Sequence, residues 1–102
     1  MNKVFNYLGL ARRAGKIVFG TDAVLKNLNK QQTHMIFVAS DSSDATIDKV
    51  EKKGYFYKIP VIKKYSTTEL SKALGKPNPK VIGLNDKGFC EAISRELERI
   101  GD

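Results

Sequence analysis

The sequence contains one cysteine, one histidine and no tryptophan. The single cysteine, Cys90, excludes an internal disulfide and a thiolate metal cluster, which favours a reducing, intracellular environment. Cys90 is expected to pack as a small hydrophobic residue, and His34 to have a surface or capping role. One histidine and scattered acidic residues provide neither a catalytic triad nor a zinc site. The sequence therefore predicts a protein without enzyme activity, metal or cofactor.

Long hydrophobic runs are also missing. No apolar stretch approaches the roughly 20 residues of a membrane-spanning helix. The stretch at residues 1–16 turns polar and cationic after its first ten residues, unlike a signal peptide. A chain of 102 residues with 41% apolar content is long enough for one compact domain and too short for two. We therefore expect a single cytoplasmic domain over residues 1–102 that has no contact with membranes.

Positive charge is abundant and unevenly distributed. The chain has 18 Lys and Arg against 11 Asp and Glu, a formal net charge of +7. Residues 1–30 contain six basic and one acidic side chain, and residues 31–80 contain nine basic and five acidic ones. Residues 81–102 contain three basic and five acidic side chains. A basic body with an acidic tail is typical of proteins that bind polyanions. The alternative is a lysine-rich surface that serves only solubility.

The apolar pattern predicts helices that alternate with strands, without internal repeats. The expected helices cover residues 2–14, 22–30, 44–53, 66–74 and 86–99. The expected strands cover residues 17–19, 35–39, 57–62 and 81–84, and Pro60 indicates that the third is an edge or irregular strand. Alternation at this spacing predicts an α/β fold: a three-layer α/β/α sandwich around a four-stranded mixed sheet.

Several residues are expected to mark the ends of these helices. Gly15, Gly54 and Gly75 stand where a glycine often closes a helix. Thr21 is the predicted N-cap of the second helix. Ser66, with a glutamate three residues later, matches a capping box.

Two segments carry charge or rigidity that folding alone does not explain. In the first segment, three cations precede the short strand: Arg12, Arg13 and Lys16. Gly20 and Thr21 follow that strand and begin a helix. The open N–H groups and positive dipole end of that helix favour a phosphate oxygen. Lys26, four residues beyond Asp22, lies on the same helical face and can reach a phosphate or a base edge. The alternative is that Thr21 and Asp22 only cap the helix and the cations are solvated.

The second segment is a loop in which prolines alternate with polar residues: Lys76, Pro77, Asn78, Pro79 and Lys80. Such a loop loses little freedom on binding because proline has already removed much of it. A simple connector is the alternative. In a doubly wound sheet the two segments can lie at the same end, which would give one combined basic surface.

Four motifs appear in a characteristic order. They are ARRAGK at residues 11–16, FGTDAVLK at 19–26, VIKKYSTTELSKALGK at 61–76 and VIGLNDKGF at 81–89. Over roughly residues 3–95 they resemble the YlxQ group of bacterial proteins, within the L-seven-Ae superfamily of ribosomal proteins that recognise kink-turn RNA. The resemblance implies an α/β/α sandwich and a structured RNA partner, ribosomal RNA included. We expect a monomer with no small-molecule substrate.

The resemblance also implies which residues contact RNA. Kink-turn binders read Gly-Thr-Asn-Glu-x-x-Lys at the start of the second helix, where Asn and Glu contact the guanines of sheared G·A pairs. Gly20, Thr21 and Lys26 match this motif, whereas Asp22 and Ala23 replace the Asn and the Glu. A second contact comes from the loop after a Leu-Gly pair, which packs on extruded nucleotides. Here that pair is followed by residues 76–79.

The two replacements change the chemistry of base recognition. Asparagine can donate to the acceptor atoms of guanine, whereas an ionised aspartate only accepts, and Asp22 also repels phosphates. Ala23 has no polar group. Each lost base contact is worth on the order of 1–3 kcal/mol. The sequence therefore predicts RNA binding through the phosphate backbone with altered base readout. The alternative function is a protein–protein adaptor that keeps the fold and has lost specific RNA recognition.

Overall fold

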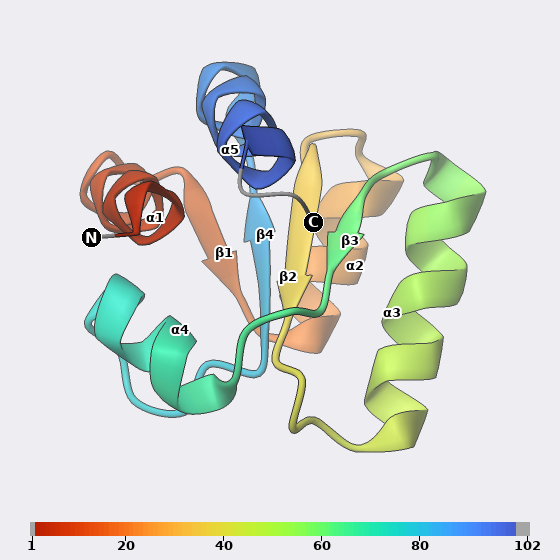
Figure 1. The fold of residues 1–102 in the computed structure, drawn as a ribbon. Coiled ribbons are helices and arrows are strands. Elements are labelled where there is room, and N and C mark those ends of the chain that lie inside the picture. The colour runs from red at the N-terminus through yellow and green to blue at the C-terminus, as the bar shows by residue number, and fades with distance from the viewer. Residues whose placement is uncertain (1, 100–102) are drawn as a thin grey trace.

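The computed structural model describes residues 2–99; Met1 and residues 100–102, which the predicted domain of 1–102 includes, lie outside the described residues. Helices and strands alternate in the predicted order (Figure 1): α1 (Lys3–Arg13), β1 (Ile17–Phe19), α2 (Thr21–Asn29), β2 (Met35–Val38), α3 (Asp44–Tyr57), β3 (Val61–Ile62), α4 (Thr67–Leu74), β4 (Val81–Leu84) and α5 (Lys87–Arg99). Among the helices of the described residues, none has the length and hydropathy needed to cross a bilayer.

The four strands form one mixed sheet in the order β1-β4-β2-β3. β4 pairs antiparallel with β1 and with β2, whereas β2 and β3 are parallel. The two central strands, β2 and β4, are buried along their whole length, which explains why they are continuous apolar runs. β3 is an edge strand, as Pro60 indicated.

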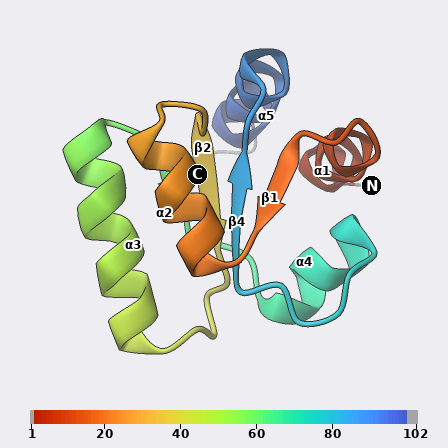
Figure 2. The same ribbon diagram turned by 180° about the vertical axis from the view of Figure 1, so that it is seen from behind.

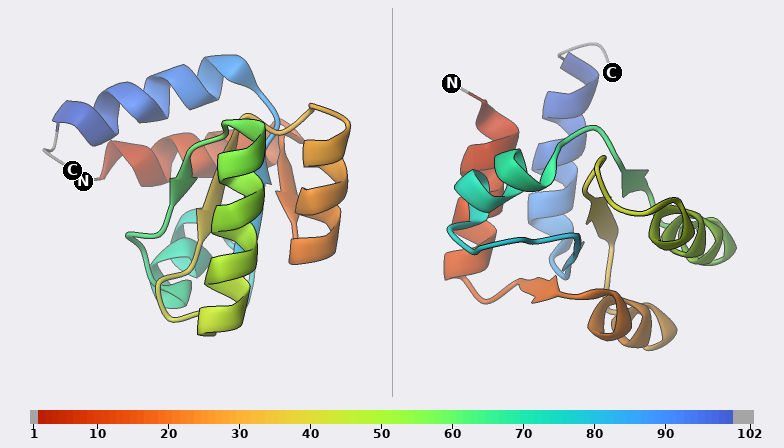
Figure 3. Two further views of the ribbon diagram at one scale, coloured as in Figure 1. Left: turned by 90° about the vertical axis from the view of Figure 1, so that its right-hand side faces the viewer. Right: turned by 90° about the horizontal axis from the view of Figure 1, so that it is seen from below.

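Helices cover both faces of this sheet (Figures 2 and 3). α1, α4 and α5 share one apolar core with the first face, which includes Leu8, Phe37 and Ile93. α2 and α3 form a second core on the opposite face, which includes Val24 and Val50. The predicted three-layer α/β/α sandwich is confirmed.

Two of the predicted helix ends are confirmed in detail. Gly75 closes α4 in the left-handed conformation, with φ of 68°. At the other end of α4, the Glu69 amide donates to Ser66 Oγ at 3.2 Å, and the Ser66 amide donates to Glu69 Oε1 at 3.0 Å. This reciprocal pair is the predicted capping box.

The N-cap of α2 differs from the prediction. Gly20 occupies it, and Thr21 is the first helical residue. The Gly20 amide still belongs to the β1 ladder, since it donates to the Val81 carbonyl at 2.9 Å. The chain therefore turns at Gly20 itself, with φ of 98°, a value that glycine adopts readily and other residues rarely do.

The prediction that Gly54 ends the third helix is also wrong. α3 continues through Gly54 to Tyr57. A Cβ atom at position 54 would collide with the Val61 side chain and approach the Ile59 carbonyl oxygen to 3.1 Å. Glycine stands here because α3 packs closely on β3, and not because the helix stops.

The predicted strand over residues 57–62 is correspondingly shorter. Tyr57 is the last residue of α3, and Lys58 turns the chain in the left-handed conformation with φ of 58°. Only Val61–Ile62 remain as strand.

Replacing Gly54 with alanine tests this close contact. Alanine favours a helix over glycine by about 1 kcal/mol, but we expect the overlap with Val61 to dominate and Gly54→Ala to lower the free energy of unfolding by about 1–3 kcal/mol. Urea denaturation measures the change. Adding Val61→Ala should be less costly in the Gly54→Ala background than in wild type. An unchanged or raised stability of Gly54→Ala would contradict the contact.

Candidate nucleic-acid interface

The end of β1 and the beginning of β4 lie side by side because the two strands are antiparallel. Phe19 pairs with Ile82, and the next residue, Gly20, is hydrogen-bonded to Val81. The loop at residues 76–80 runs directly into β4, so it meets the start of α2 at the lower end of the sheet in Figure 1. Both segments line a shallow hollow of about 400 Å³, formed by Phe19, Gly20, Thr21, Lys76, Asn78, Pro79, Lys80 and Val81. We refer to it as the α2–loop hollow.

The start of α2 presents backbone donors at this hollow. An α-helix leaves its first N–H groups without intrahelical partners. Gly20 has no side chain to cap them, and the first intrahelical bond runs from the Val24 amide to the Gly20 carbonyl at 3.0 Å. These donors and the helix dipole favour an anionic ligand. Asp22, exposed in the first turn, places a negative charge beside them.

The loop at residues 76–80 has a defined conformation. Pro79 is buried, and Asn78 adopts the left-handed conformation with φ of 51°. Lys76 Nζ lies 4.6 Å from the centre of the Phe19 ring, close enough for a cation–π contact. Pro77 and Asn78 are exposed. The loop thus keeps its tip in solvent while Pro79 and Lys76 fix its base.

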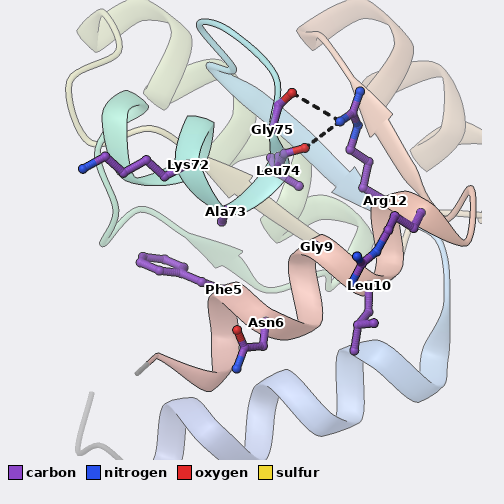
Figure 4. A pocket seen from close by; sticks show the side chains of 10 residues that line it. Phe5, Asn6, Gly9, Leu10, Arg12, Lys72, Ala73, Leu74 and Gly75 are labelled. Atoms are coloured by element: carbon purple, nitrogen blue, oxygen red, sulfur yellow. Dashed lines mark hydrogen bonds between the residues drawn. The ribbon is translucent and has the colours of Figure 1, made fainter.

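Arg12 holds the point where this loop leaves α4. Its Nη1 donates to the Leu74 carbonyl at 2.8 Å and to the Gly75 carbonyl at 3.3 Å (Figure 4). These carbonyls form the negative end of the α4 dipole, where a cation is stabilising. The guanidinium also lies 5.9 Å from the centre of the Phe19 ring. Arg12 therefore has a structural role that the sequence analysis did not predict.

Lys80 holds the other end of the loop through a polar cluster. Thr67, at the start of α4, donates its hydroxyl to Asp41 Oδ1 at 2.8 Å and its amide to the same oxygen at 2.9 Å. Lys80 Nζ donates to Thr67 Oγ1 at 2.9 Å and lies 3.9 Å from Asp41 Oδ2. The Thr67 hydroxyl and amide, with the Lys80 charge, hold the pKa of Asp41 below its ordinary value of 3.8.

Three of the predicted cations lie away from the α2–loop hollow. Lys16 precedes β1, at the opposite end of that strand from Gly20, and its carbonyl accepts from the Asn85 amide. Arg13 lines a separate groove between α1 and α4. Lys26 is exposed in the second turn of α2, about 9 Å along the helix axis from Gly20. The two predicted segments therefore lie side by side at the α2–loop hollow, whereas Lys16, Arg13 and Lys26 lie outside it.

Phe19, Asp41 and Thr67 also belong to this region, and the sequence gives no signal for them. Phe19 has the pattern of an ordinary strand residue, and Asp41 and Thr67 are separated by 26 positions. No local pattern connects them, because their contacts depend on the packing of α4 against the sheet.

Cys90 lies outside the site, on the buried side of α5, as the sequence predicted. Burial raises the pKa of its thiol to about 11, with smaller contributions from Asp86 and Glu91. The thiol is therefore protonated at neutral pH, which disfavours a role as a nucleophile.

The model of the ribosomal protein L7Ae/L30e/S12e/Gadd45 family matches residues 2–92. The chain belongs to this family. The family resemblance predicted from the four motifs is confirmed.

Two members of the YlxQ group are close in sequence. RNA-binding protein YlxQ of Enterococcus faecium is 34% identical over 96 residues, covering 94% of this chain and 92% of that protein. RNA-binding protein YlxQ of Bacillus subtilis (strain 168) is 35% identical over 94 residues, covering 92% and 94% respectively.

Solved structures share the fold. A protein of unknown function from Bacillus halodurans C superimposes with a TM-score of 0.92 at 31% identity, over 96% of this chain and 99% of that one. The Giardia lamblia 15.5kD RNA binding protein superimposes with a TM-score of 0.80 over 94% of this chain and 82% of that one. At 14% identity the second comparison supports the fold alone.

The depressed pKa of Asp41 gives a test of the polar cluster at α4. A carboxylate whose pKa is lowered in the folded state stabilises the protein above its unfolded pKa, near 3.8, and this contribution is lost as the pH falls through the lower folded value. We expect the urea midpoint of the wild type to fall more steeply below pH 3.8 than that of Asp41→Asn, which cannot titrate. If the urea midpoints of the wild type and Asp41→Asn fell equally steeply below pH 3.8, the result would contradict a stabilising role for the Asp41 carboxylate.

Proposed function

We propose that this protein binds structured RNA, ribosomal RNA included, at the α2–loop hollow, and that it does so without catalysing a reaction. The convergence of an uncapped helix start with a proline-fixed, lysine-bearing loop is the observation that carries the proposal. Family membership supports it, since two relatives that cover nearly the whole chain are named RNA-binding proteins.

Each side of the hollow has a part in this proposal. The free N–H groups at the start of α2 would bind a phosphate oxygen, and Lys26 would neutralise a phosphate farther along the helix. Pro77 and Asn78 would pack on an unstacked nucleotide, with Lys76 supplying positive charge at the base of the loop. Because the loop is already ordered, little conformational entropy is lost on binding.

This chain differs from kink-turn binders in the two residues that would recognise bases. Asp22 is exposed at the position where the resemblance places an asparagine, and Ala23 offers no polar side chain at the next. Phosphate contacts give affinity without discriminating between sequences. We therefore propose that the protein binds RNA with altered recognition of sheared G·A pairs.

Salt dependence separates this function from that of a protein–protein adaptor. Binding of a fluorescent kink-turn hairpin should weaken with salt, with log K falling by about 0.9 per contacted phosphate for each tenfold rise in salt. Lys76→Ala and Lys26→Ala should each weaken binding and reduce that slope by about 1. Fluorescence anisotropy at several salt concentrations measures both quantities.

Lys87→Ala is the matched control, because Lys87 is exposed at the opposite end of β4. It should bind RNA like the wild type apart from a small effect of net charge. RNA affinity that does not change with salt, or an equal loss in all three variants, would refute binding at the α2–loop hollow.

Restoring the base-reading residues tests the altered readout. Asp22→Asn combined with Ala23→Glu should increase the preference for a kink-turn over a straight duplex of the same length. The expected gain is about 1–3 kcal/mol for each restored contact. Competition between the two RNAs measures this preference. Asp44→Asn combined with Ala45→Glu makes the same two changes at the start of α3 and should leave the preference unchanged. An equal gain in that control would mean that the effect does not depend on the position in α2.

A further inference from the structure

Two adjacent aromatic side chains at the end of α3 are almost completely exposed. Tyr55 is 89% exposed and Phe56 is 74% exposed. Burying a ring of this size removes a large apolar area from water and is strongly favourable. Apolar surface concentrated at one place on a small protein commonly marks a binding surface. The proposed RNA site uses neither residue.

The exposed rings border a hollow of about 830 Å³. Its apolar lining comes from the Gly54 backbone, the two rings, Ile59 and Pro60. The left-handed turn at Lys58 lets Ile59 and Pro60 line the same hollow as the two rings. We refer to this hollow and its two rings as the aromatic corner.

The aromatic corner is supported from behind. The Phe56 ring packs edge-on against Tyr57, with 5.0 Å between ring centres and 84° between ring planes. The Tyr57 hydroxyl donates to Asn29 at the end of α2, which ties the last turn of α3 to its neighbour. A partner would therefore meet a partly pre-ordered surface.

The charge around the aromatic corner is positive. Lys49, Lys52 and Lys53 precede Phe56 by seven, four and three positions, so they lie on the same side of α3. Lys58 follows the helix and lines the hollow with Lys52. Of the acidic neighbours, Asp48 is paired with Lys52 at 3.0 Å and Glu51 with Lys63 at 2.9 Å, which leaves Lys49, Lys53 and Lys58 as the surplus. This excess of cations around an apolar centre is complementary to an acidic segment that carries an apolar side chain.

The aromatic corner and the α2–loop hollow lie at opposite ends of the molecule. α3 runs from the lower end of the sheet, where the loop at residues 76–80 lies, to the upper end (Figures 1 and 3). A ligand at one end would leave the other accessible.

We propose that the aromatic corner docks an acidic protein segment that inserts one large apolar side chain between the rings and Ile59. Tyrosine anchors beside a pocket, surrounded by a charged rim, are typical of protein interfaces. A stacked base would need an open, flat ring platform. Here the rings share the hollow with the aliphatic residues Ile59 and Pro60. These features favour a peptide over single-stranded RNA, and the proposal does not depend on RNA binding elsewhere.

A displayed library of random dodecapeptides, selected on the wild-type protein, provides the probe. The enriched peptides should carry net negative charge and at least one Leu, Ile, Phe or Trp. Synthetic copies should bind the Tyr55→Ser/Phe56→Ser variant at least tenfold more weakly. Leu10→Ser is the matched control, because Leu10 is 45% exposed on a different surface. It should bind these peptides like the wild type, and unchanged circular dichroism and melting temperatures would show that all variants fold.

Three results would overturn the proposal. One is a selection that yields no peptide dependent on Tyr55 and Phe56. Another is enriched peptides no more acidic or apolar than the starting library. The third comes from a labelled dodecauridylate: if its affinity, and not that of the peptides, falls in the double variant, the aromatic corner binds RNA instead.

Discussion

The hydrogen bond between the Gly20 amide and the Val81 carbonyl joins the two segments that form the proposed RNA site. It is the last rung of the antiparallel pairing of β1 with β4. This pairing requires that whatever follows β1 lies beside whatever precedes β4. The start of α2 and the loop at residues 76–80, separated by more than fifty positions in the sequence, are neighbours for this reason.

α4 then fixes the loop from its other side. A cation from α1, Arg12, binds the carbonyls at its C-terminal end, and Asp41 accepts hydrogen bonds from Thr67 at its N-terminal end. Both charges match the helix dipole. The basic residues of this region therefore divide into two groups. Arg12 and Lys80 are held by hydrogen bonds at the two ends of the loop. Lys26, exposed on α2, and Lys76, which rests on the Phe19 ring at the hollow, remain suited to contact a phosphate.

The sequence predicts the fold well, because the buried strands and amphipathic helices depend on local apolar periodicity. The structural role of a single glycine is harder to predict from the sequence. Gly75 ends a helix, whereas Gly54 lies inside one, and only the approach of α3 to β3 distinguishes them. The adjacency of the two segments of the proposed site was predictable from the order of helices and strands. The role of Arg12 was not, since its partner Leu74 is 62 positions away.

The shortness of α4 has a consequence for motion. An isolated helix of eight residues does not persist in water, so α4 depends on its packing and on the contacts at its two ends. We therefore expect α4 to open as a cooperative unit at a lower free energy than the sheet. The loop at residues 76–80 would lose its anchor whenever α4 opens. A ligand held by this loop would then slow amide hydrogen exchange throughout α4, including at residues that it never touches.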